Sequence, residues 1–143
     1  MLINTEKIQN FTLTKKLDEI YLNQTKEKLI EFLGNPIDSS PQHKNTKEIF
    51  SYGVIQVYLF NNFVKGFTLD YQRKDHSGNP FTLEEIHQEN ILNFMCENQI
   101  SYVEDTRLSF QEGKVFIVSN NLYLGFNNNL LNVLGLYDDT NTP

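Results

Sequence analysis

Two segments near the start of the chain repeat their apolar residues at helical spacing. Residues 14–22 and residues 25–33 both place such side chains three and four positions apart, which predicts two short helices. The second helix is expected to end at Gly34, because glycine accepts the left-handed conformation of a helix C-terminus and Pro36 cannot continue a helix. The polar stretch that follows, residues 38–47, is expected to be a loop.

Residues 48–71 change to β-branched and aromatic side chains, in the three runs IFSYG, VIQVYLF and FVKGFTLDY. Such runs predict three strands. Asn61 and Asn62 lie between the second and third run and tolerate positive φ, so they predict a hairpin turn. The aromatic residues occupy both parities of the strand pattern and cannot all face one core. Some are therefore exposed or covered by another molecule, unless the sheet is buried on both sides within this chain.

The second half again places a helix before strands. A charged linker, residues 72–80, precedes Thr82 and Glu85, which have the spacing of a capping box and predict a helix through about Glu97. Strand-like runs follow at residues 107–110, 115–118, 122–126 and 130–137. The asparagines at 127–129 predict another hairpin turn.

The two halves align with each other. Laying residues 49–72 over residues 115–138, an offset of 66, gives five identities: Phe50 with Phe116, Phe60 with Phe126, Asn61 and Asn62 with Asn127 and Asn128, and Tyr71 with Tyr137. We therefore expect an α+β fold of two tandem helix-plus-antiparallel-sheet repeats, at residues 1–75 and 76–143, which together form one globular domain. A small unit cannot bury both its faces alone, so we expect the two repeats to form one larger sheet with helices on one face. Shared apolar patterning in an asparagine-rich sequence is the alternative explanation.

Composition places the chain among folded, soluble proteins. Its 143 residues, 39% apolar and 13% aromatic, suffice for a core without disulfides. The net charge of −6 repels phosphate backbones, so direct nucleic-acid binding is not expected. The sequence has one cysteine, no apolar run of membrane-spanning length and no secretory pattern at its start, which predicts a cytoplasmic protein that does not contact a membrane.

No residues have the spacing of a catalytic or cofactor site. His43, His76 and His87 lie far apart, and the seven glycines follow no phosphate-loop pattern. Cys96 lies within a helical pattern and is expected to be a small buried thiol rather than a nucleophile. We therefore expect no catalytic residue, no metal ligand and no cofactor, and a protein that is not an enzyme.

Binding of another protein is the activity that the pattern favours. Aromatic and acidic side chains gather in and after the third strand-like run, where rings can anchor a partner and carboxylates can select a basic one. The residues expected to contact the partner are Tyr58, Phe63, Asp70, Tyr71 and Asp75.

Residues 20–36, IYLNQTKEKLIEFLGNP, together with the IFSYG and VIQVYLFNNFVKGFTLDY runs that follow, resemble the SmpA/OmlA outer-membrane lipoprotein family and the β-lactamase-inhibitor-protein fold. In both, a threonine-started helix ends in Leu-Gly-x-Pro and leads into a meander of strands. In the second half, residues 97–100 stand where that motif would be. The inhibitor fold is a tandem duplication whose concave sheet grips an enzyme, so the resemblance implies a protein-binding sheet.

Small, acidic, cysteine-poor chains of this pattern are also similar in type to bacterial immunity proteins, each of which neutralises one toxin. The leading hypothesis is an immunity-type inhibitor, a monomer or weak homodimer, that binds a basic cognate toxin such as a nuclease and occludes its active site. The alternative is a non-enzymatic adaptor or self-associating structural protein that uses the same sheet face. A small-ligand or enzymatic role in a cleft between the halves is a third, weaker hypothesis.

Overall fold

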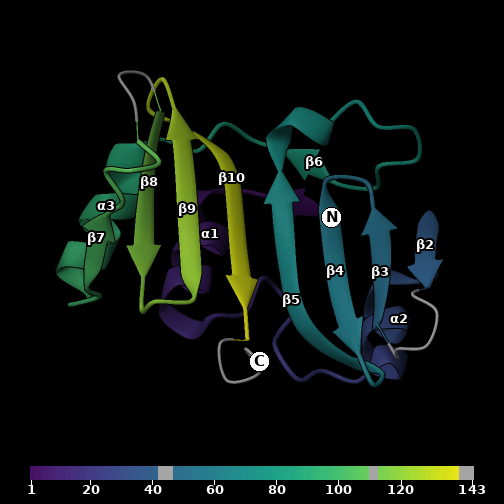
Figure 1. The fold of residues 1–143 in the computed structure, drawn as a ribbon. Coiled ribbons are helices and arrows are strands. Elements are labelled where there is room, and N and C mark those ends of the chain that lie inside the picture. The colour runs from purple at the N-terminus through teal and green to yellow at the C-terminus, as the bar shows by residue number, and fades with distance from the viewer. Residues whose placement is uncertain (42–46, 110–112, 139–143) are drawn as a thin grey trace.

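The computed structural model describes residues 1–41, 47–109 and 113–138, and it consists of a large antiparallel sheet with helices behind it (Figure 1). The helices are α1 (Thr5–Thr14), α2 (Lys26–Leu33) and α3 (Gln88–Glu97), with the 3₁₀ turn η1 (Tyr71–Arg73). The strands of the large sheet are β2 (Asp38–Pro41), β3 (Lys47–Tyr52), β4 (Ile55–Phe60), β5 (Phe63–Asp70), β7 (Tyr102–Glu104), β8 (Gly113–Val118), β9 (Leu122–Asn127) and β10 (Leu130–Tyr137). The strands β1 (Leu2–Ile3) and β6 (Thr82–Leu83) form a separate parallel pair. The expected α+β class is confirmed.

The large sheet has the strand order β2-β3-β4-β5-β10-β9-β8-β7, and all its neighbours are antiparallel. On each side of the centre, strands that follow one another in sequence pair with one another. β5 and β10 join the two sides at a seam where Leu69 faces Leu134. One continuous sheet therefore includes strands from both halves of the chain, with its helices on one face (Figure 1).

The helix α1 was not predicted. It begins after Asn4, whose side chain accepts a hydrogen bond from the Lys7 backbone nitrogen at 3.0 Å and so caps the helix. Its inner face buries Ile8 and Phe11. A capping asparagine followed by apolar residues at helical spacing was the available signal.

The helix predicted at residues 14–22 is wrong. Lys15, with φ of 61°, ends α1 in the left-handed conformation, and Asp18, with φ of 57°, makes a second reversal. Leu17 and Ile20 face each other in an isolated antiparallel bridge, and both are fully buried. The two side chains are spaced as in a helix, but a tight turn directs both of them into the core.

The helix α2 follows the prediction. Thr25 caps it by accepting a hydrogen bond from the Lys28 backbone nitrogen at 3.2 Å, and Gly34 ends it with φ of 80°. The predicted start of α3 at Thr82 is wrong, because Thr82 lies in β6 and its backbone nitrogen bonds to Met1 O at 2.9 Å. The helix begins at Gln88 and ends, as expected, at Glu97.

One strand prediction and one loop prediction also need correction. In the segment predicted as a strand at 107–110, the described residues form a turn in which Leu108 N bonds to Asp105 O at 3.1 Å; Phe110 lies outside the described residues. The edge strand is instead β7. At the other edge, β2 occupies the start of the predicted loop 38–47, whose residues 42–46 lie outside the described part. Polar residues are tolerated in β2 because it packs at the margin of the sheet.

The asparagine turns are confirmed, with one correction to the alignment of the halves. Asn61 and Asn62 have φ of 53° and 66°, and Asn128 and Asn129 have φ of 52° and 66°. The matching turn residues therefore differ by 67 positions, whereas the ungapped alignment used 66. The turn between β8 and β9, which contains Asn120, is one residue longer than the turn between β3 and β4.

One hydrophobic core lies between the sheet and the helices. Phe67 of β5 is fully buried, and its ring centroid lies 5.8 Å from that of Phe11 on α1. Cys96 is exposed, so its prediction as a buried thiol was wrong. It lies on the outer side of α3, whereas Ile91 and Met95 point inward.

The three histidines, which lie far apart in the sequence, form no cluster among the described residues. His76 and His87 are exposed, and His43 lies outside the described residues. No helix of the described chain has the length and apolarity needed to cross a membrane.

Candidate functional site

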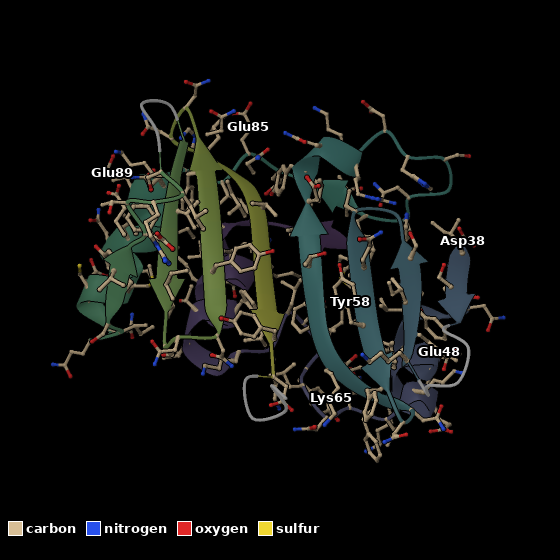
Figure 2. All side chains as sticks on the ribbon, viewed as in Figure 1. Asp38, Glu48, Tyr58, Lys65, Glu85 and Glu89 are labelled. Atoms are coloured by element: carbon tan, nitrogen blue, oxygen red, sulfur yellow. The ribbon has the colours of Figure 1, made fainter. Side chains whose placement is uncertain are left out.

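The sheet face turned away from the helices carries its own set of side chains, and we call it the open face. β4 shows the alternation: Ile55, Val57 and Leu59 are buried, whereas Gln56 and Tyr58 point to the other side. Figure 2 views the open face, with Tyr58 near the middle of the first four strands. The prediction that the aromatics of this stretch divide between core and surface is confirmed, because Phe67 is fully buried and Tyr58 is 37% exposed.

Tyrosines on the open face lie beside glycines of neighbouring strands. Tyr123 of β9 lies over Gly135 of β10, because a Cβ built on Gly135 would be only 2.6 Å from Tyr123 Oη. Glycine at 135 therefore leaves the space that the ring occupies. On the other side of the seam, Tyr58 of β4 faces Gly66 of β5.

These side chains border a strip of the open face that we call the tyrosine trough, made of Tyr58, Tyr123, Tyr137, Gly66, Thr68 and Gly135. Gly66 faces Tyr137 and Thr68 faces Gly135 across the seam, so these residues share one face. Tyr137 is held by a hydrogen bond from its Oη to Asn120 O at 2.7 Å. Neighbouring strands are about 5 Å apart, so the backbones that carry Tyr58 and Tyr123 are roughly 14 Å apart.

Asp70 brings a carboxylate to one end of the tyrosine trough. It is half-buried at the end of β5, and its Oδ1 accepts a hydrogen bond from the Gln72 backbone nitrogen at 2.9 Å. Burial raises the pKa of Tyr123, and the nearby Tyr58 and Asp70 raise it further. Tyr123 is therefore a neutral phenol at physiological pH, and it lies within the electrostatic reach of a carboxylate.

A groove of about 490 Å³ continues the open face from the trough across β9 and β8. Its lining is mainly apolar and includes Leu108, Val115, Ile117 and Val133, together with Tyr123 and Tyr137 of the trough. The turn after β7 forms one wall, where Asp105 and Arg107 make an ion pair at 3.2 Å. The hydrogen bond between these side chains lowers the pKa of Asp105 and raises the pKa of Arg107.

Of the five residues predicted to contact a partner, Tyr58 and Asp70 lie on the open face of adjacent strands. Phe63 is 42% exposed at the other end of β5, beside the asparagine turn. Tyr71 lies in η1, where its Oη donates a hydrogen bond to Glu84 O at 2.8 Å and burial, followed by the Glu84 charge, raises its pKa. Asp75 is exposed in the turn after η1. The five residues therefore do not form one cluster.

Sequence reasoning missed Tyr123 and Tyr137. Both lie in strands that were predicted, and both belong to an alternating tyrosine–glycine pattern, with Gly125 two residues after Tyr123 and Gly135 two residues before Tyr137. Residues two apart in a strand share a face, so this pattern was the available signal.

The described residues include no group of three or more His, Cys, Asp or Glu side chains that could hold a metal ion. Cys96 Sγ lies 3.8 Å from Tyr102 Oη, and that contact raises the pKa of Tyr102. His76 Nδ1 lies 3.0 Å from Ser77 O.

No family model matches this sequence, and no curated protein matches it. Among solved structures, the 1.5 Å crystal structure of an extracellular protein containing a SCP domain from Bacillus anthracis str. Ames is similar over 82% of this chain and 44% of that chain. The identity is 12% and the TM-score is 0.47, so the likeness carries no argument about function. The chain spans less than half the length of that protein. The resemblance to the SmpA/OmlA and β-lactamase-inhibitor-protein patterns stays a prediction.

Proposed function

We propose that this chain is a protein-binding inhibitor of the immunity type, whose open face docks on a basic cognate toxin and occludes its active site. The observation that carries the proposal is the tyrosine trough, an aromatic strip at the centre of a sheet face that none of the described helices covers. Tyrosine is enriched at protein interfaces, because a large rigid ring buries apolar area while its hydroxyl keeps a polar contact. Inhibition by occlusion requires no catalytic group in the inhibitor.

The edges of the sheet are poorer docking sites than its face. A partner strand that adds to an edge needs a row of unpaired backbone groups. β7 has three residues, and β2 has four residues, among them Asp38 and Pro41. Short edge strands with charge and proline disfavour strand addition. This leaves the open face as the larger available surface.

The charge of the chain favours a cationic partner. Residues 76–143 include nine acidic and two basic side chains, whereas residues 1–75 include nine acidic and ten basic ones. A negative surface steers a basic protein toward the complex and selects against acidic ones. A lysine or arginine of the partner placed over Tyr58 or Tyr123 and beside Asp70 gains about 0.5–2 kcal/mol from the aromatic face. Nucleases, which bind polyanions, are one class of toxin with such a surface.

We also propose that residues 1–75 and 76–143 are two copies of one helix-and-sheet unit. The starts of α2 and α3 are fixed to the following hairpins by corresponding backbone hydrogen bonds. They are Lys26 N to Asn62 O at 2.9 Å, Gln88 N to Asn129 O at 2.8 Å, Val64 N to Gln24 O at 2.9 Å and Leu131 N to Ile86 O at 2.8 Å. The trough then lies at the junction of the copies and depends on both.

The cytoplasm is the compartment that we propose for this activity, because the chain has a single cysteine and an immunity protein acts inside the cell it protects. An adaptor or self-associating protein that uses the same face is the second candidate. The exposed tyrosines of the open face favour it too, because a second copy could cover them.

The proposal is tested by capture with tagged protein from its native cytoplasm, together with the product of the adjacent gene. We expect one basic protein to be retained and to be released as salt rises, because screening weakens charge attraction. Asp70→Asn should weaken retention, and Leu13→Ala, at a 52% exposed residue of α1, should not. Self-association of the chain, with no protein retained at low salt, would instead favour the second candidate.

A further inference from the structure

A second, smaller pocket lies on the open face beside β2 and apart from the tyrosine trough. Its volume is about 200 Å³, and its lining includes Asp38, Ser39 and Ser40 of β2, Ser51 of β3, and Arg73 and His76 from the segment after β5. Its size is below that of a typical site for a drug-sized ligand and suits a small polar group.

Ser51 is the first unusual feature of this pocket. Its side chain is on the open face between its cross-strand neighbours Asp38 and Gln56, and the residue is 8% exposed. Its Oγ is buried without a hydrogen-bond partner in the part of the chain that the structure describes. A buried hydroxyl without a partner costs free energy, and a ligand in the pocket would supply the missing acceptor.

Arg73 is the second unusual feature. Its Nε donates a hydrogen bond to Gly53 O at 3.0 Å, which fixes the guanidinium beside the turn between β3 and β4. The described residues provide no hydrogen bond or ion pair to its Nη1 and Nη2. A guanidinium held at one nitrogen, with two others available in a pocket, presents the fork that binds an oxyanion through two parallel hydrogen bonds.

We propose that this pocket binds a small oxyanion, a carboxylate or a phosphate, through Arg73 and Ser51. The hydroxyl of Ser40, which shares the open face with Ser51, supplies a further donor at its rim. The negative charge of Asp38 repels an anion. Its Oδ1 already accepts a hydrogen bond from the Ser39 backbone nitrogen at 2.9 Å. Because none of these residues belongs to the trough, the site is independent of the proposed docking of a toxin.

The test is an amide chemical-shift titration of the full chain with sodium phosphate and, separately, sodium acetate, with ionic strength held constant by sodium chloride. We expect saturable shifts at the residues that line the pocket. Tighter binding of phosphate would define a phosphate site, and tighter binding of acetate a carboxylate site. Arg73→Gln should weaken binding roughly tenfold, whereas Lys74→Gln, at an exposed neighbour outside the pocket, should not. Shifts that do not saturate, or that survive Arg73→Gln, would overturn the proposal.

Two further variants distinguish a loss of anion binding from a loss of folding. Ser51→Ala should weaken anion binding several-fold without lowering the melting temperature, because the hydroxyl has no internal partner. A marked loss of thermal stability would show that the hydroxyl has a structural role, and would refute the assignment. Asp38→Asn should strengthen anion binding, since it removes a negative charge from the rim. Weaker anion binding by Asp38→Asn would contradict an oxyanion site.

Discussion

The contact between Tyr123 and Gly135 predicts an energetic coupling that unfolding experiments can measure. In Gly135→Ala the new Cβ would lie 2.6 Å from Tyr123 Oη and closer to the ring, so the ring must leave its place. If about 50 Å² of ring surface becomes exposed, roughly a third of what an aromatic side chain buries, the cost at about 25 cal/mol/Å² is about 1.3 kcal/mol. Alanine is favoured over glycine in a strand by roughly 0.5–1 kcal/mol. The net expectation is a destabilisation of about 0.5 kcal/mol.

The effect of Gly135→Ala on the free energy of unfolding should change sign when the ring is absent. In a Tyr123→Ala background, Gly135→Ala should stabilise the chain by roughly 0.5–1 kcal/mol, because only the strand preference remains. The double-mutant cycle should therefore give a coupling of about 1.3 kcal/mol. Free energies of unfolding come from urea titrations followed by far-UV circular dichroism, with the m-value checked for each variant.

The control cycle pairs Tyr123→Ala with Gly66→Ala. A Cβ on Gly66 would meet Leu136 O at 3.1 Å and Tyr137, and Tyr123 is not among its nearest neighbours. These two substitutions should be additive. Additivity within about 0.3 kcal/mol in the Tyr123 and Gly135 cycle as well would refute the reasoning, because the ring would then not occupy the space above Gly135.

Three further predictions concern the core, a helix cap and pH. Phe67→Ala should destabilise the chain by about 3–5 kcal/mol in urea titrations, since Phe67 is fully buried against Phe11; a loss below about 1 kcal/mol would contradict this packing. Asn4→Ala should cost about 1 kcal/mol of thermal stability by removing the cap of α1, and an unchanged melting temperature would argue against the cap. Burial raises the pKa of Tyr52 from 10.0 to about 12, so its contribution to stability is complete below pH 10 and is lost as pH rises through 12. Tyr52→Phe should flatten the fall of unfolding free energy between pH 10 and pH 12, and an equal slope in both proteins would contradict the shift.

The elements that sequence reasoning predicted well are those in which local signals agree. In α2, a capping threonine, helical spacing and Gly34 all point to the same bounds. The hairpin turns could be predicted because Asn61 and Asn62 tolerate a backbone conformation that few other residues adopt.

The errors arose where tertiary contacts override local pattern. The spacing of Thr82 and Glu85 suits a helix start, but pairing with β1 uses the backbone of Thr82 and delays the helix to Gln88. Leu17 and Ile20 have helical spacing and are buried through a turn. Neither outcome follows from local sequence, because each depends on segments that are distant in the chain.

The candidate site was predictable in part. Tyr58 and Asp70 could be chosen from the first half because aromatic and acidic residues are concentrated there. Tyr123 and Tyr137 join them only because β10 pairs with β5, and the sequence does not specify that pairing. Tyr71 was chosen for its residue type, but a turn after β5 directs its hydroxyl to Glu84 O.

In the proposed function, the open face contacts the partner. The most direct test is the dissociation constant of the captured partner for a Tyr58→Ala and Tyr123→Ala double variant, compared with Leu13→Ala on α1. We predict that the open-face variant loses more than about tenfold in affinity while its urea midpoint changes little more than that of Tyr123→Ala alone, and that Leu13→Ala binds as the unaltered chain does. Unchanged affinity in the open-face variant, or a loss confined to Leu13→Ala, would contradict the claim and move the interface to the helical side.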